Sequence, residues 1–174
     1  MSTLLATPPD AGDYAPFYAR YIATVPAGDV LDTLERQIDD TLTLLGEFGE
    51  ARGSHRYAPG KWTVKEMAGH LADTERVFVY RAMCIARGET QSLPGFDENT
   101  YVANAGFDAR SLASLLGEIT AVRRATLTFF RNLDDAALAR RGTANGATVT
   151  PHAIAYILAG HERHHLSILR ERYA

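Results

Sequence analysis

The sequence predicts an all-α protein, a four-helix bundle with long connections and an irregular N-terminal arm. Four long segments carry apolar residues at spacings of three and four, the pattern of amphipathic helices. No segment shows the alternating pattern of a half-buried strand. At 174 residues the chain is large enough for one domain with a buried core. We therefore expect a single domain, residues 1–174, in which residues 1–27 form the arm and residues 28–172 the bundle.

The arm leads into the first helix. Residues 1–27 combine prolines with aromatic side chains, which we expect to pack on the body of the protein or on a second subunit. Asp29 is the expected N-cap of a helix that runs from Val30 to Gly46 or Phe48. Its apolar face recurs with helical spacing through Val30, Leu31, Leu34, Ile38, Leu42, Leu45 and Phe48.

The second helix has the clearest start in the chain. Thr63 and Glu66 match the capping box, in which each side chain bonds to the backbone of the other residue. Trp62 and Met67 occupy the two positions of a hydrophobic staple, so the sequence favours a structural task for Trp62. The helix should end near Arg87, before a glycine.

The third and fourth helices follow long connections. Residues 88–107 form the first connection, which is long enough to cover a site or to cross an end of the bundle. The third helix is expected over residues 108–131, with an aspartate as its N-cap. The fourth is expected over residues 150–172, with Thr150 as N-cap and Pro151 at the first helical position.

Three histidines are candidate metal ligands. His161 and His165 lie near the middle of the apolar stripe of the fourth helix, about 20° to either side of its centre. Two desolvated imidazoles one turn apart need a common partner, and neutral imidazole is the commonest protein metal ligand. His70, on the second helix, reaches the same level of the bundle if helices two and four run antiparallel, as we predict. Three protein ligands leave a position for water or substrate, as in catalytic zinc sites. His164 is the alternative to His165.

Two glycines precede these histidines. Gly69 and Gly160 stand inside predicted helices, where a glycine costs about 1 kcal/mol relative to alanine. We expect both to permit the close approach of a backbone or a ligand.

Three charged residues on or near the apolar stripes need an explanation. His161-Glu162-x-x-His165 matches the metalloprotease pattern, in which glutamate is the general base. A protease is disfavoured, because no strand is predicted that would hold a peptide, but Glu162 is a candidate to move a proton on water. A solvated helix charge is its alternative. Glu75 and Arg123 intrude on apolar stripes, and we expect them to pair, as a structural pair or beside a cofactor pocket.

Composition argues against several partners. The net charge of −3, with Arg and Lys spread along the chain, offers no footprint for nucleic acid. No apolar run approaches the roughly 20 residues that span a bilayer. Cys84 is the single cysteine, so no internal disulfide can form, and we expect a cytoplasmic protein.

Four short motifs resemble the DinB/YfiT superfamily of metalloenzymes. Residues 62–66, 70–75 and 160–161 and His165 carry the resemblance by their order and spacing, and it extends over residues 28–172. The resemblance implies a four-helix bundle with one divalent metal ion, zinc or nickel, bound by the three histidines. Members of the superfamily often form homodimers, and we expect one here. Some members of the superfamily are thiol-dependent S-transferases or isomerases that use bacillithiol, mycothiol or glutathione.

The expected function is a metal-dependent enzyme acting on a small molecule. A thiol-dependent S-transferase is favoured, in which a low-molecular-weight thiol becomes a thiolate and attacks a small electrophile. The first alternative is a metal-dependent hydrolase that activates water, with Glu162 as base. The second alternative is a non-catalytic stress protein that binds a metal or a small molecule.

Overall fold

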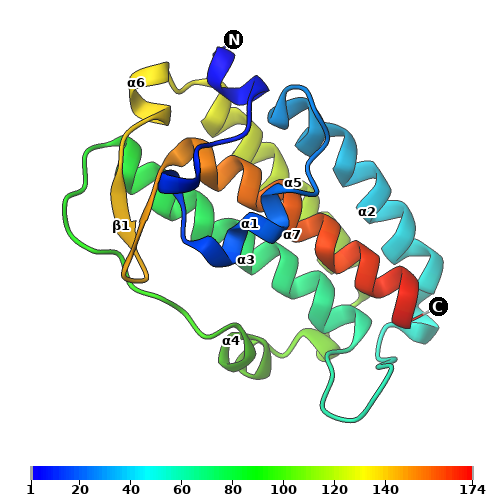
Figure 1. Ribbon diagram of the computed structural model, residues 1–174. Coiled ribbons are helices and arrows are strands. Elements are labelled where there is room, and N and C mark those ends of the chain that lie inside the picture. Colours follow the sequence, from blue (N-terminus) through cyan, green and yellow to red (C-terminus); the bar gives the residue numbers. More distant parts are fainter. Residues whose placement is uncertain (1, 174) are drawn as a thin grey trace.

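The computed structural model describes residues 2–173 and has four long helices packed as a bundle (Figure 1). Helices α2 and α3 lie diagonally opposite each other, because each packs mainly on α5 and α7. The predicted fold class is confirmed. The four helices are α2 (Val30–Arg52), α3 (Val64–Ala86), α5 (Leu112–Arg131) and α7 (Pro151–Arg172).

Shorter elements fill the arm and the two connections. The arm contains more helical structure than the sequence predicted, including α1, and the first connection contains α4. The short α-helices are α1 (Ala19–Ile22), α4 (Glu98–Ala105) and α6 (Asp135–Leu138), and 3₁₀ turns span Thr3–Ala6, Ala11–Asp13, Pro16–Tyr18 and Phe107–Ala109.

A β-hairpin in the second connection was not predicted. Strands β1 (Gly142–Ala144) and β2 (Ala147–Val149) pair antiparallel and are too short to show an alternating pattern. The turn has a recognisable signature, since Asn145 and Gly146 both adopt positive φ angles, 52° and 73°. Asn-Gly is the preferred pair for such a two-residue turn.

The predicted N-caps hold for three of the four long helices. Asp29, Thr63 and Thr150 each accept a backbone N–H bond of the helix that follows, and the capping box of Thr63 and Glu66 is complete. The prediction for α5 is wrong, because Ser111 and not an earlier aspartate is the N-cap.

Asp108, the expected N-cap of α5, has a different structural role. Asp108 lies in a 3₁₀ turn, where its carboxylate accepts a hydrogen bond of 2.7 Å from the hydroxyl of Thr63.

Helix α2 continues to Arg52, past the expected end. Gly49, with a φ of 62°, interrupts its helical geometry, a conformation that glycine adopts without the penalty of a Cβ.

Helices α3 and α7 run antiparallel, as predicted. At the start of α3, the carbonyl of Trp62 accepts a 2.6 Å bond from the hydroxyl of Tyr173, which follows α7. Toward the other end, Phe78 of α3 and Ile154 near the start of α7 belong to one apolar cluster. This arrangement brings the start of α3 to the end of α7.

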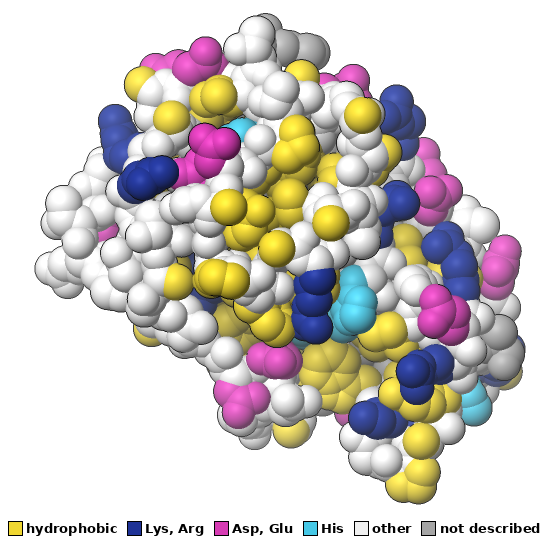
Figure 2. All heavy atoms as spheres, viewed as in Figure 1, with side chains coloured by type: hydrophobic (Ala, Val, Ile, Leu, Met, Phe, Trp, Pro, Cys, Tyr) yellow, Lys and Arg dark blue, Asp and Glu magenta, His cyan; other side chains and the backbone are white. Residues whose placement is uncertain are grey.

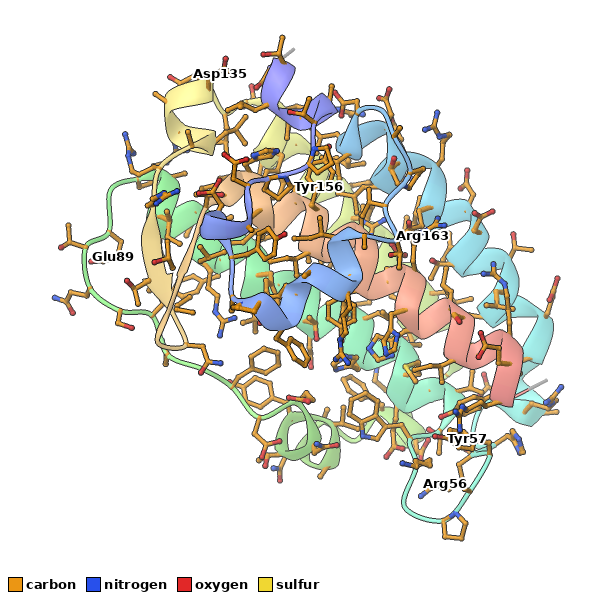
Figure 3. The ribbon with its side chains drawn as sticks, in the orientation of Figure 1. Arg56, Tyr57, Glu89, Asp135, Tyr156 and Arg163 are labelled. Atoms are coloured by element: carbon orange, nitrogen blue, oxygen red, sulfur yellow. The ribbon has the colours of Figure 1, made fainter. Side chains whose placement is uncertain are left out.

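The arm packs on the body of the protein. The ring of Tyr18 meets Phe78 edge-on, with ring centroids 5.9 Å apart. Tyr156 projects from α7 and donates a hydrogen bond of 3.1 Å to the carbonyl of Leu5 (Figure 3). Contacts to α3 and α7 thus fix the arm.

The core consists of two apolar clusters with a polar layer between them. One cluster includes Leu34, Phe78 and Leu158, and the other includes Leu45 and Leu166. Polar side chains from all four long helices occupy the level between the two clusters. This polar layer comprises Gln37, Thr41, His70, Thr74, Glu75, Arg123, His161, Glu162 and His165, all buried except the half-buried His161.

Among residues 2–173, no helix combines the length and the apolar character that crossing a membrane requires.

Candidate metal centre

The three predicted histidines converge in the polar layer. His70 projects from α3, and His161 and His165 project from α7, one turn apart. The Nε2 atom of His161 lies 3.2 Å from Nε2 of His70 and 3.0 Å from Nε2 of His165. One ligand atom from each residue lies within 4.8 Å of the other two.

These distances fit a shared cation. Zn–N bonds of about 2.0–2.1 Å place neighbouring ligand nitrogens roughly 2.9–3.4 Å apart in tetrahedral or octahedral geometry. Both short Nε2–Nε2 distances fall in that range. A neutral imidazole nitrogen carries either a proton or one lone pair, so His161 Nε2 cannot make good hydrogen bonds to both neighbours at once. A cation can accept all three lone pairs.

Burial keeps the three imidazoles in the form that binds metals. It lowers the pKa of His70 to about 4. Burial, and secondarily the neighbouring histidines, also holds the pKa values of His161 and His165 well below 6.5. All three rings are therefore neutral near pH 7, with a lone pair available for coordination.

The outer nitrogens of the rings differ in their partners. His70 Nδ1 lies 3.3 Å from the hydroxyl of Thr74, which can fix the orientation of the ring. His165 Nδ1 is buried and has no hydrogen-bond partner among the described residues.

Two aromatic residues enclose the cluster. The half-buried Trp62 packs on His70 in a tilted arrangement and stacks on His165, with centroid distances of 4.5 and 6.3 Å. Tyr21, from α1, meets His161 edge-on at 5.7 Å. The sequence did not assign either residue to the site, because the staple position already explained Trp62 and no periodicity placed the arm. On the face shown in Figure 2, a histidine side chain reaches the surface beside hydrophobic and basic residues.

His164 lies outside the cluster. Its ring packs on Tyr21, with centroids 5.3 Å apart, and it lines a separate pocket. The geometry therefore favours His165 over His164 as the third ligand.

The expected pair of Glu75 and Arg123 forms and is part of a larger network. Arg123 Nε donates to Glu75 over 3.0 Å, and Nη2 donates over 2.8 Å to the same carboxylate and to Glu162. Arg123 Nη1 donates over 2.7 Å to the carbonyl of Leu34. Burial lowers the pKa of Arg123, but the two carboxylates more than offset this, so the guanidinium stays charged.

Glu162 is not a solvated charge. It is buried, and its carboxylate accepts hydrogen bonds from the amide of Gln37, from Arg123 and, over 2.5 Å, from the hydroxyl of Thr41. These donors hold it toward α2 and α5. Gln37 and Thr41 were missed at the sequence level, although their spacing of four within an apolar stripe is a usable signal.

The two glycines allow close contacts, as expected. A Cβ on Gly160 would lie 2.1 Å from the carbonyl oxygen of Tyr21, so glycine lets α1 press against α7. A Cβ on Gly69 would lie 2.4 Å from the ring of Phe107. In both cases the neighbour is protein.

Fold and site together define a class, a four-helix bundle with a three-histidine cluster in its polar layer. The sequence profile of the DinB superfamily matches residues 33–169. The chain belongs to the DinB superfamily. No curated protein sequence matches it.

Two solved structures resemble the protein at low sequence identity. YfiT from Bacillus subtilis, described as a probable metal-dependent hydrolase with an unusual four-helix bundle topology, superposes with a TM-score of 0.71. Its identity is 17%, over 95% of this chain and 90% of that one. A mycothiol-dependent maleylpyruvate isomerase superposes with a TM-score of 0.68 at 15% identity, over 84% of this chain but 61% of that one. Both comparisons establish a shared fold.

Proposed function

We propose that the protein is a metal-dependent enzyme that transfers a low-molecular-weight thiol to a small electrophile. His70, His161 and His165 would hold one divalent ion, zinc or nickel. The observation that carries the proposal is the convergence of three neutral imidazole nitrogens on one point. Such a ligand set leaves room for a further ligand.

The charge of the polar layer favours a cation. Glu75, Arg123 and Glu162 carry a formal net charge of −1 in the core. A cavity of about 10 Å³, the size of a single water, lies between this network and His161. Buried negative charge at such short range stabilises a nearby cation, because the interior screens charges weakly.

The engagement of Glu162 favours a thiol over water as the nucleophile. A metal ion at this site would supply a deprotonated thiol, since a coordinating thiol loses its proton outright. The hydrolase alternative uses Glu162 as its base, and Glu162 already accepts hydrogen bonds from three side chains. The histidines would bind the ion, Thr74 would orient His70, and Trp62 and Tyr21 would exclude water.

A conjugation assay tests this function. Metal-loaded protein is mixed with 1-chloro-2,4-dinitrobenzene and, in turn, cysteine, glutathione and other small thiols. We expect conjugate formation only when a thiol is present. The His161→Ala variant should lose this activity, and the His164→Ala variant should keep it. Turnover of esters without any thiol would favour the hydrolase instead. Bound metal without turnover of either kind would favour a binding protein.

Three further properties belong to the proposal. Composition supports a cytoplasmic location, and the family resemblance supports a homodimer acting on a small molecule. The molar mass in solution tests the dimer, which a monomeric mass would exclude.

A further inference from the structure

A charged pocket lies next to the histidine cluster, and none of the three candidate metal ligands lines it. It opens between α1, α2 and the C-terminal half of α7, with a volume of about 330 Å³. Arg20, Arg163 and Arg170 line it together with Asp40. Arg163 lies on α7 (Figure 3), and Figure 2 shows several basic side chains on this part of the surface.

The charge of the pocket calls for an acidic ligand. Three guanidinium groups and one carboxylate give a formal charge of +2. His164 also lines the pocket. Within residues 2–173, neither Arg163 nor Arg170 forms a salt bridge. Arginine guanidinium groups bind carboxylates well, because their paired donors match the two oxygens.

A second, independent observation calls for a hydrogen-bond donor on the same ligand. Gln37 lines the pocket and is only 4% exposed. Its amide nitrogen donates to Glu162 and, over 3.1 Å, to the carbonyl of Ala159, which fixes the orientation of the amide. Its Oε1 atom is then buried with no partner among the described residues. Buried acceptors are normally paired, and Asp40 lines the same pocket as Gln37.

We propose that this pocket binds the α-amino-acid end of a small molecule. The arginines would take its carboxylate, and Gln37 Oε1 and Asp40 would take its ammonium group. Inorganic phosphate satisfies the arginines but leaves Gln37 unpaired and is repelled by Asp40.

The pocket adjoins the histidine cluster. His164, which lines it, is three residues from His161, about 4.5 Å along the helix axis. Tyr21 contacts both rings. If the proposed function holds, on which this step rests, the thiol cosubstrate is an amino-acid or peptide thiol.

Calorimetric titration with S-methylglutathione tests the site. Its sulfur is capped and cannot become a thiolate, so binding is measured on the purified protein and again after chelation. We expect binding in both states, and about tenfold weaker binding for Arg163→Ala and for Arg170→Ala. Arg124→Ala, which removes an exposed arginine from α5, should bind as the wild type does.

Changes to the ligand test the same site without any variant. N-acetyl-S-methylglutathione lacks the ammonium group and should bind about tenfold more weakly to the wild type. Asp40→Asn should remove much of that difference. The inference would be overturned if S-methylglutathione did not bind, or if its N-acetyl form bound the wild type as tightly. It would also be overturned if both arginine variants bound S-methylglutathione as tightly as the wild type does, or if equimolar phosphate displaced it. The metal content of the same samples reports separately on the proposed function.

Discussion

Arg123 carries the positive charge that two buried carboxylates share. Its guanidinium, 2% exposed, bridges Glu75 on α3 and Glu162 on α7 and also bonds to the backbone of α2. Removing one partner from such a network leaves uncompensated charge in the core, which costs more than the lost contacts.

The substitution Arg123→Met measures that cost. We expect the free energy of unfolding to fall by about 3–5 kcal/mol, because Glu75 and Glu162 would stay buried without a counter-charge. Urea denaturation is the measurement, and Arg124→Met, at an exposed position, should change it by less than about 0.5 kcal/mol. Equal effects of the two substitutions would contradict the role of the network.

The histidines make the metal-free protein sensitive to acid. Burial lowers the pKa of His70 to about 4 in the folded state, against 6.5 in the unfolded chain. Above pH 6.5 both states are neutral and stability is full. As the pH falls from 6.5 to 4, the unfolded state takes up the proton first, so stability is lost.

For His70 this loss amounts to about 3 kcal/mol. We expect the free energy of unfolding of the chelated wild type to drop more steeply between pH 7 and pH 4 than that of His70→Gln. Chemical denaturation at a series of pH values gives both slopes. Parallel pH profiles would show that His70 is not buried in its neutral form.

At the scale of elements, Gly160 fixes the distance between α1 and α7. A Cβ there would meet the carbonyl oxygen and carbon of Tyr21, at 2.1 and 2.4 Å. The obstacle is backbone, so the short helix itself would have to move away, and the aromatic wall of the histidine cluster with it.

Two alanine substitutions should therefore have opposite signs. Gly160→Ala should destabilise the protein by about 1–3 kcal/mol through overpacking. Gly117→Ala, at an exposed position inside α5 with open space around it, should stabilise it by about 0.5–1 kcal/mol. Thermal unfolding of both variants is the measurement. Stabilisation by Gly160→Ala would show that α1 does not pack as closely as described.

The elements also show where local sequence signals suffice. Asp29, Thr63 and Thr150 were correctly predicted as N-caps, because each precedes an apolar helical pattern directly. Two acceptable N-caps, Asp108 and Ser111, stand close together before α5. Ser111 caps the helix, and Asp108 instead accepts the tertiary hydrogen bond from Thr63, which local sequence signals do not reveal.

At the scale of the whole molecule, the polar layer separates two apolar clusters and joins all four long helices. The sequence predicted the three histidines and the pairing of Glu75 with Arg123, because each intrudes on an apolar stripe and so requires a partner. It could not predict the walls and the charged pocket. These combine Tyr21 and Arg20 of the arm with residues of α2 and α7, and no periodicity relates those segments.

An ion on His70, His161 and His165 would link α3 to α7. A ligand that binds the folded state alone stabilises it by about 2.7 kcal/mol at a free concentration of 100 Kd. We expect chelation to lower the Tm of the metal-loaded wild type by about 5–10 °C. The Tm of His161→Ala should not change on chelation. An unchanged Tm of the wild type would argue against a metal ion that links α3 to α7.

The metal content of three purified proteins tests the central claim most directly. Wild type, His161→Ala and His164→Ala are loaded with zinc or nickel, dialysed and analysed by mass spectrometry for metal per chain. We expect about one ion in the wild type and in His164→Ala, whose ring lies outside the cluster, and almost none in His161→Ala. Equal metal in the wild type and in His161→Ala would contradict a three-histidine metal centre.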